Sequence, residues 1–384
     1  MKNAAYFDNA ATTFPKPEKV YSFMDRFYRE YGVNIGRGNH EMALAAGSLS
    51  TDTRELLLKL FECPQKKVAF SHSVTESINV ILQGLDWNKG DNVYITPFEH
   101  NAVTRVLHHL KSVYGINVIE LECIKTSLQL DIEAIKYQFQ ENKPRVVMAI
   151  HASNVCGSIM PIKELFDLAK KFKAITMVDM AQTAGLIKTS LTNVQADFAF
   201  FAGHKTLYGP FGIAGCISDF NISIKPLIFG GTGMDSGNQD MPQSIPGKYE
   251  PGSPNIMAIA GLNAGLKWIE ETTIDAIFEK EKVNHKKLTE LLNNYSNVKI
   301  IGKDNECQIG VVSCLFRGYS SDSIGPVFSE NKVAIRTGLH CSPTAHKYLG
   351  TFPSGTVRFS VSYFTEEEDF DILRKALDYI ENNG

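Results

Sequence analysis

The chain has 384 residues, of which 43% are hydrophobic and 21% are charged, and its formal net charge is −3. This length favours two domains, because single hydrophobic cores stop growing at roughly 250–300 residues. The near-neutral balance, without a block of like charge, argues against nucleic acid or a membrane surface as the partner.

The start of the chain and its cysteines indicate where the protein works. The opening residues lack the apolar core of a signal peptide, and no run approaches the roughly 20 apolar residues that span a bilayer. The seven cysteines are scattered and form no CxxC pair. We therefore expect reduced thiols and a cytoplasmic location.

Short apolar runs recur along the first two thirds of the chain and alternate with helical patterns such as residues 161–172. Continuous apolar runs are typical of strands that are covered on both faces. Alternation of strand and helix predicts right-handed crossovers and a mainly parallel sheet. The predicted strands are residues 67–73, 92–98, 116–122, 145–153, 174–182, 196–204 and 212–219.

The pattern changes near Pro254. A long helix is predicted over residues 256–271, followed by a charged helix near 272–295. Shorter predicted strands follow at 297–301, 309–316 and 355–362. We expect a large α/β domain over residues 16–255, and a smaller α+β domain made of residues 1–15 and 256–384.

Polar side chains follow the predicted strands directly. Ligands of parallel sheets bind beyond the carboxyl ends of the strands, so these side chains are candidates for one site. Ser73 and Glu76 fit a capping box, and the free amides of that helix start, with the Thr75 hydroxyl, suit a phosphate. By itself this pattern is weak, because a well-capped helix explains it too. The candidate residues at the strand ends are Ser73, Val74 (through its backbone amide), Thr75, His100, Asn154, Asp179, Gln182, His204 and Lys205.

Lys205 stands out because it follows a buried strand inside a glycine-punctuated turn, where an ammonium group either reaches water or reacts. Asp179 ends another buried strand and could pair with a pyridinium nitrogen or cap the next helix. Gln182 could reach a phenolic oxygen, and the Asn154 amide could donate to a phenolate or a substrate carboxylate. His100 alone would be a structural residue. Together these groups predict pyridoxal phosphate (PLP) held as a Schiff base by the lysine.

The ordered motifs "YFDNAATT", "TESIN", "EHNAV", "HASNVCG", "VDMAQ", "AGHKTLYGP", "YEPGSPN" and "RTGLHC" resemble those of class V aminotransferase-fold enzymes. Within that group the chain resembles the cysteine desulfurases, in particular their SufS-like branch, from residue 6 to about residue 364. The resemblance implies the two-domain, fold type I architecture of PLP-dependent transferases, an α/β fold, and a homodimer.

The resemblance also implies a role for each matching residue. Lys205 would form the Schiff base and move protons at the substrate α-carbon, while His100 would stack on the ring and assist. Asn154 and Arg358 would hold the substrate carboxylate, the arginine as a bidentate fork, and Arg336 is a further substrate-binding candidate. Ser253 would reach the phosphate of the neighbouring subunit. The implied cofactor-binding residues are Val74, Thr75, His100, Asp179, Gln182, His204, Lys205 and Ser253.

Cys341 carries the reaction-specific part of the resemblance. It would attack the substrate sulfur, become a persulfide and release alanine. A thiolate is the nucleophile, and neighbouring cations such as Arg336 or a charged His340 would favour it. The alternative is a small buried core cysteine. A zinc site here is not expected, because no second ligand pair has suitable spacing, and no other metal is predicted.

The chain departs from the family at Ala202, where a serine or threonine is usual, and at Leu339, where a second histidine is frequent. The resemblance implies an L-cysteine desulfurase that passes sulfur to a small acceptor protein, as in iron–sulfur cluster assembly. Selenocysteine lyase, cysteine sulfinate desulfinase, aminotransferase and epimerase activities remain open on the same scaffold. A sulfur-transfer scaffold with weak activity is a further alternative.

Overall fold

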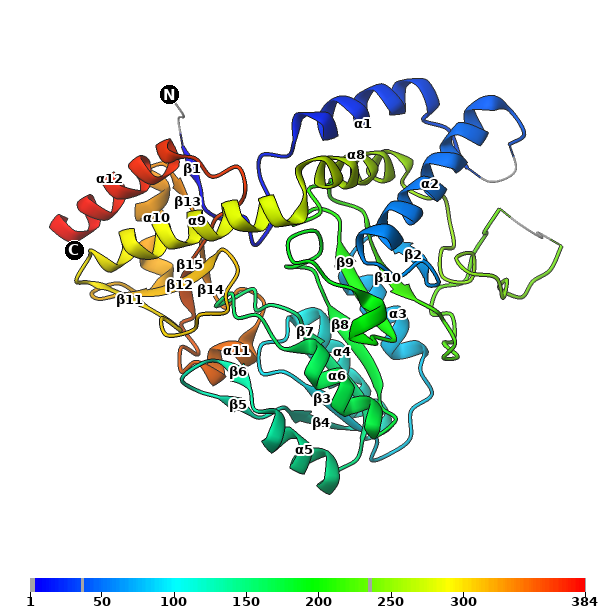
Figure 1. The fold of residues 1–384 in the computed structure, drawn as a ribbon, viewed down its shortest axis with the longest axis horizontal. Coiled ribbons are helices and arrows are strands. Elements are labelled where there is room, and N and C mark those ends of the chain that lie inside the picture. Colours follow the sequence, from blue (N-terminus) through cyan, green and yellow to red (C-terminus); the bar gives the residue numbers. More distant parts are fainter. Residues whose placement is uncertain (1–3, 36–37, 234–236, 384) are drawn as a thin grey trace.

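A seven-stranded sheet forms the centre of the larger part of the chain in the computed structural model, which describes residues 4–35, 38–233 and 237–383 (Figure 1). The strand order is β2-β10-β9-β8-β7-β3-β4; β10 runs antiparallel to both neighbours, and the other pairs are parallel. Six of the strands lie within one predicted run each, and β7 begins one residue before its run, which confirms the mainly parallel α/β fold. The strands are β2 Lys67–Ser71, β3 Asn92–Ile95, β4 Asn117–Glu120, β7 Pro144–Ile150, β8 Ile175–Asp179, β9 Phe198–Ala202 and β10 Ala214–Ser218.

Helices such as α3 and α6 cover the seven-stranded sheet, and α9 leads from it to the four-stranded sheet of the C-terminal part (Figure 1). No helix in the described ranges is both long enough and apolar enough to cross a membrane. The helices are α1 Glu18–Tyr31, α2 Glu41–Leu60, α3 Val74–Gly84, α4 Asn101–Tyr114, α5 Ile132–Glu141, α6 Ile162–Lys171, α7 Leu191–Val194, α8 Ile256–Thr272, α9 Ile274–Asn293, α10 Ser321–Glu330, α11 Pro343–Tyr348 and α12 Glu367–Asn383.

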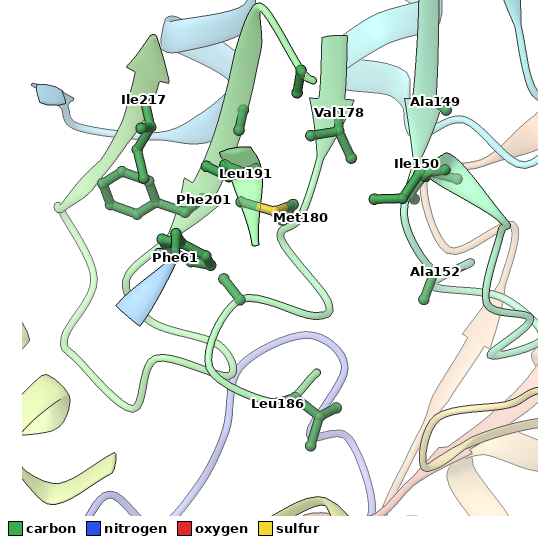
Figure 2. Close-up of a cluster of buried hydrophobic side chains, with 14 of the residues drawn as sticks. Phe61, Ala149, Ile150, Ala152, Val178, Met180, Leu186, Leu191, Phe201 and Ile217 are labelled. Carbon is green, nitrogen blue, oxygen red and sulfur yellow. The ribbon is translucent and has the colours of Figure 1, made fainter. Parts of the chain in front are cut away.

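Both faces of the seven-stranded sheet are buried, which explains why its strands are continuously apolar. Successive side chains of a strand point to opposite faces. In β7, Val146 and Met148 join the core formed with α3 and α4, whereas Val147 and Ala149 join the core on the other face. Figure 2 shows part of that second core, where Phe201 of β9 packs among side chains from neighbouring strands and loops.

The C-terminal part is built on a four-stranded antiparallel sheet in the order β11-β12-β15-β14. Its core contains Leu288 from α9, Phe328 from α10, Phe359 from β15 and Leu377 from α12. The N-terminal strand β1 pairs in parallel with β13, so the first residues of the chain join this part. The remaining strands are β1 Ala5–Tyr6, β5 Cys123–Ile124, β6 Gln129–Leu130, β11 Val298–Ile300, β12 Val311–Phe316, β13 Val333–Ala334, β14 Arg336–Gly338 and β15 Thr356–Ser360.

Helix α8 follows directly after the boundary expected at residue 255. It packs against α1 and α2, on the side of the seven-stranded sheet, and α9 then leads to the four-stranded sheet (Figure 1). The division into residues 16–255 and residues 1–15 with 256–384 stays a prediction.

Candidate active site

A cavity of about 300 Å³ lies beyond the carboxyl ends of the parallel strands and is lined from both parts of the chain. The position follows the rule for open parallel sheets. Most of the residues singled out from the sequence meet there, and Ala202 lines the cavity with them. They are Val74, Thr75, His100, Asn154, Asp179, Gln182, His204, Lys205, Arg336, Cys341 and Arg358.

Ser253 lies elsewhere. It does not line the cavity, its side chain is exposed, and its hydroxyl accepts a 3.4 Å hydrogen bond from Asn34. Its expected contact is with a neighbouring subunit, so that role stays a prediction.

One end of the cavity is the N-terminus of α3. The Ser73 hydroxyl accepts a hydrogen bond from the Glu76 amide at 3.2 Å, as the capping box predicts. The Glu76 carboxylate, however, accepts from the His72 amide at 2.8 Å, one residue before the predicted donor. The first amides of a helix have no carbonyl partner within it and carry partial positive charge. The Val74 and Thr75 amides therefore belong to a helix start at the cavity wall whose free N–H groups suit an anion.

His204 places a ring nitrogen near that wall. Its imidazole stacks on Phe211, with ring centroids 4.5 Å apart, and its Nδ1 is buried without a hydrogen-bond partner among the described residues. Burial, together with the charge of Lys205, lowers the pKa of this histidine to about 3. The ring is therefore neutral at pH 7. A buried orphan nitrogen needs a partner, and an anion at the start of α3 would supply one.

Lys205 is surrounded by protein and touches the cavity. Burial lowers its pKa from 10.5 to about 8, although the charge of Asp179 opposes this shift. Burial raises the pKa of Asp179 in turn, against a backbone hydrogen bond and the charge of Lys205. Asp179 Oδ1 accepts from the Ala181 amide at 2.8 Å. The carboxylate therefore stabilises the turn that follows β8 and also lines the cavity. A cationic ring nitrogen would compensate this buried carboxylate.

Two further predicted residues are held by the backbone. His100 Nδ1 accepts from the Ala102 amide at 3.1 Å and caps α4, while burial and then the charge of Lys205 lower the pKa of the imidazole to about 4. Gln182 Nε2 donates to the Ala10 carbonyl at 2.8 Å. His100 is therefore a neutral ring at the cavity, and Gln182 ties the N-terminal segment to it.

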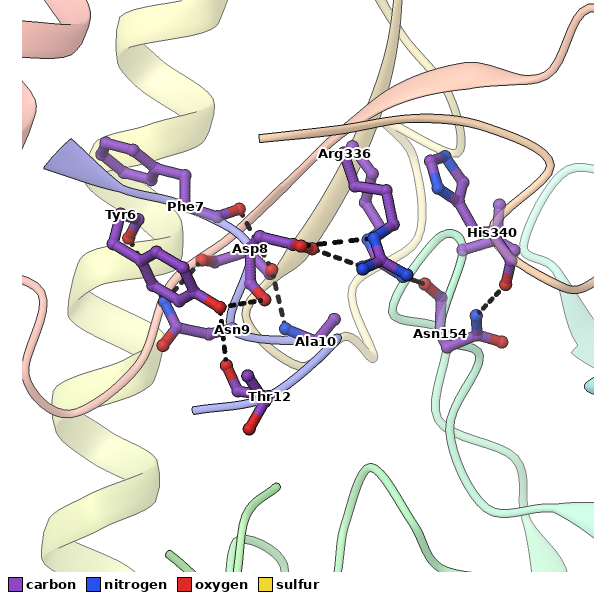
Figure 3. A network of polar contacts seen from close by, with 12 residues as sticks. Tyr6, Phe7, Asp8, Asn9, Ala10, Thr12, Asn154, Arg336 and His340 are labelled. Atoms are coloured by element: carbon purple, nitrogen blue, oxygen red, sulfur yellow. Dashed lines mark hydrogen bonds and ion pairs between the residues drawn. The ribbon is translucent and has the colours of Figure 1, made fainter. Parts of the chain in front are cut away.

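Sequence reasoning missed Asp8, although it lies in the quoted motif "YFDNAATT". Its carboxylate accepts from Arg358 NH2 at 2.7 Å and from Arg336 Nε at 3.2 Å (Figure 3). Arg358 NH1 donates to the Asn154 carbonyl at 2.9 Å, and its buried Nε has no partner in the described part of the chain. Asp8 thus orients the arginine that is proposed to bind a carboxylate, and it leaves the Nε–H of that guanidinium without a partner among the described residues.

The Cys341 loop is held in an unusual backbone conformation. His340 and Cys341 have φ values of +46° and +58°, a region that costs a non-glycine residue of order 1–3 kcal/mol. Burial, followed by the charge of Arg358, lowers the pKa of His340 to about 2. The expectation of a charged His340 beside the thiol was therefore wrong. Arg336 is the remaining cation of that prediction, and it lines the cavity with the exposed Cys341.

The residues present fit PLP. A helix start and an orphan imidazole nitrogen suit the phosphate, a buried carboxylate suits the pyridine nitrogen, and a lysine of lowered pKa suits the aldehyde. At Ala202 the wall offers a methyl group, so the hydroxyl usual in the family is missing. Among the described residues no three His, Cys, Asp or Glu side chains are arranged to hold a metal ion.

The class-V aminotransferase family model matches residues 5–373, and the chain belongs to this PLP-dependent family. It is 30% identical over 380 residues to a probable cysteine desulfurase of Pyrococcus abyssi, covering 97% of this chain and 93% of the relative. A cysteine desulfurase of Thermococcus onnurineus superposes with a TM-score of 0.91 at 28% identity, over 99% and 95% of the two chains. The Escherichia coli cysteine desulfurase CsdA superposes with a TM-score of 0.85 at 25% identity, covering 98% of this chain and 94% of CsdA.

Proposed function

We propose that the protein is a PLP-dependent cysteine desulfurase that converts L-cysteine to L-alanine and keeps the sulfur on Cys341 as a persulfide. The observation that carries this proposal is that Lys205, Arg358 and Cys341 line one cavity, although they come from different parts of the chain. Similarity to cysteine desulfurases over nearly the whole chain supports it.

The cofactor would be held at three points. Lys205 would bind its aldehyde carbon, Asp179 its ring nitrogen and Gln182 its ring oxygen. The phosphate would meet the helix start of α3 and His204, with Ser253 from a second copy of the chain. When bound, PLP supplies an electron sink for the carbanion at the substrate α-carbon.

The residues of the chain perform the remaining tasks. Arg358, through its free Nε, and Asn154 bind the substrate carboxylate. Lys205, with its lowered pKa, is suited to take the α-proton near neutral pH. The Cys341 thiolate then attacks the substrate sulfur, so that an S–S bond forms and the Cβ–S bond of the substrate breaks. Cysteine and a thiol give alanine and a persulfide, and no external oxidant or reductant is needed.

The substrate is tested by giving the purified protein L-cysteine, selenocysteine and cysteine sulfinate in separate reactions with dithiothreitol. We expect alanine and sulfide in equal amounts from L-cysteine. Alanine from selenocysteine or cysteine sulfinate, but none from L-cysteine, would replace the proposed substrate. A keto acid in place of alanine would indicate an aminotransferase, and PLP absorbance without any product would favour the scaffold alternative.

We further propose that the enzyme is a homodimer in the cytoplasm that passes sulfur to a small acceptor protein. Phe211 lines the cavity yet is 65% exposed, and Phe229 is 71% exposed. A second copy of the chain that covered these two side chains would remove their apolar surface from water. The exposed Cys341 is accessible to a thiol of the acceptor.

A further inference from the structure

Ser342 directly follows Cys341 and occupies the N-cap position of α11, but its hydroxyl does not cap that helix. Serine at this position normally accepts a hydrogen bond from an amide of the first turn, as Ser73 and Ser320 do in this chain. The Ser342 hydroxyl instead donates to Asn154 Oδ1 at 2.8 Å, and the residue is fully buried. The hydroxyl has therefore been diverted from helix capping to a residue 188 positions away.

Asn154 holds the loop on both sides of the cysteine. Its Oδ1 accepts from the Ser342 hydroxyl. Its Nδ2 donates to the His340 carbonyl at 2.8 Å (Figure 3). The Cys341 carbonyl between these two points accepts from the Asn101 amide at 2.7 Å. The Asn154 carbonyl, in turn, accepts from Arg358. The two neighbours of Cys341, His340 and Ser342, are thus bonded to Asn154. The same asparagine contacts Arg358, the proposed substrate-binding arginine.

The loop needs such fastening because two consecutive non-glycine residues, His340 and Cys341, adopt positive φ values. A backbone of this kind persists only where surrounding contacts over-determine it. Asn154 makes two buried hydrogen bonds to this loop, through the His340 carbonyl and the Ser342 hydroxyl. The Asn101 amide makes a third at the Cys341 carbonyl. The His340 ring also bonds Thr356 Oγ1 at 3.0 Å, and the Ser342 amide donates to the Leu339 carbonyl at 2.8 Å. Without the Ser342 hydroxyl, Asn154 Oδ1 would be a buried acceptor that has lost its donor.

We propose that Ser342 is a positioning residue for the Cys341 thiol, acting through Asn154. The inference rests on the proposed function, because it assumes that this thiol attacks the substrate. Attack requires the two sulfur atoms to be aligned at close range, and a misplacement of about 1 Å can cost on the order of 10²-fold in rate. Ser342 bonds the acceptor Oδ1 of Asn154 and contacts neither Asn154 Nδ2 nor Arg358 Nε, the donors that would bind the substrate carboxylate. Its loss should therefore affect turnover more than substrate binding.

The test compares wild type with Ser342→Ala by two measurements. The first is hydrogen exchange of the peptide that spans residues 336–348 in the holoenzyme, measured by mass spectrometry without substrate. The second is the steady-state rate of alanine formation from L-cysteine. We expect faster exchange in this peptide, a kcat lowered about tenfold or more, and a KM changed less than about threefold. Ser342→Thr, which keeps the hydroxyl, should restore both measurements toward wild type.

Ser320→Ala is the matched control, because Ser320 is an exposed N-cap serine whose hydroxyl caps α10. It should speed exchange at the start of α10 and leave the 336–348 peptide and kcat unchanged. If Ser342→Ala does not fold, Asn154→Asp, which keeps the acceptor but removes the donor to His340, should speed exchange in the same peptide. Normal exchange and normal kcat in a folded Ser342→Ala protein would overturn the inference. If wild type makes no alanine, the proposed function is overturned instead. The exchange result would still report whether Ser342 and Asn154 hold the Cys341 loop.

Discussion

The lowered pKa of Lys205 leads to a quantitative prediction about the protein freed of its cofactor. A pKa of about 8, compared with 10.5, leaves about one amine in ten neutral at pH 7, compared with about one in three thousand. The neutral amine is the nucleophile, and its fraction at pH 7 is roughly 300 times larger for Lys205 than for an ordinary lysine, so Lys205 should be labelled at a lower pH. Burial is the main cause, and the charge of Asp179 opposes it.

Asp179→Asn is therefore expected to lower the pKa of Lys205 further, because it removes the charge that favours the ammonium form. Asparagine keeps a side-chain oxygen that can accept from the Ala181 amide, so the local turn should survive. The assay is competitive acetylation with a trace of acetic anhydride from pH 6 to 11, read by mass spectrometry of the Lys205 peptide. The exposed Lys111 is an internal reference for reagent concentration.

We expect the labelling of Lys205 to have its midpoint near pH 8 in wild type and at lower pH in Asp179→Asn. A wild-type midpoint near 10.5 would contradict the account of burial. A midpoint that rises in Asp179→Asn would show that the aspartate acts on the lysine by some route other than its charge.

Three further predictions concern the same cavity and the sheet beneath it. Burial raises the pKa of Glu99 from 4.5 to about 8. Between these two pH values the folded state binds more protons than the unfolded state. The free energy of unfolding therefore falls as pH rises through this window, by up to about 1.4 kcal/mol per pH unit. Glu99→Gln keeps an acceptor for the Ile150 amide, so its melting temperature minus that of wild type should be larger at pH 8 than at pH 5.5, and a difference independent of pH would refute this. Ala202→Ser restores a hydroxyl to the cavity wall, and PLP should dissociate about tenfold more slowly, followed by absorbance with a trapping reagent; an unchanged rate would place residue 202 away from the phosphate. Arg358→Lys removes the Nε–H donor and should raise KM for L-cysteine tenfold or more. A KM within twofold of wild type would exclude this residue as the carboxylate ligand.

The sequence was most informative where one chemical pattern repeats. Apolar runs that end in polar residues predicted the seven strands, and the carboxyl-edge rule brought Asp179, Asn154 and Lys205 to one cavity. Local patterns were reliable there because a buried parallel strand leaves few alternatives for the residue that follows it.

What could not be predicted depends on contacts between distant segments. Asp8 reaches Arg358 across 350 positions, and nothing in its neighbourhood indicates an arginine partner. The sequence around Ser342 suggests an ordinary helix cap, yet a remote asparagine competes for the hydroxyl. His340 looks like a cation beside a thiol until burial is known. The predicted contact of Ser253 with the phosphate of a neighbouring subunit stays a prediction.

The measurement that tests the central claim most directly is the mass of the Cys341 peptide after the holoenzyme reacts with one equivalent of L-cysteine without reductant. We predict that this peptide gains the mass of one sulfur atom while alanine appears in equal amount. In Cys341→Ala, PLP absorbance should persist and alanine formation should be lost. A wild-type Cys341 peptide of unchanged mass alongside normal alanine formation, or full activity in Cys341→Ala, would contradict the account.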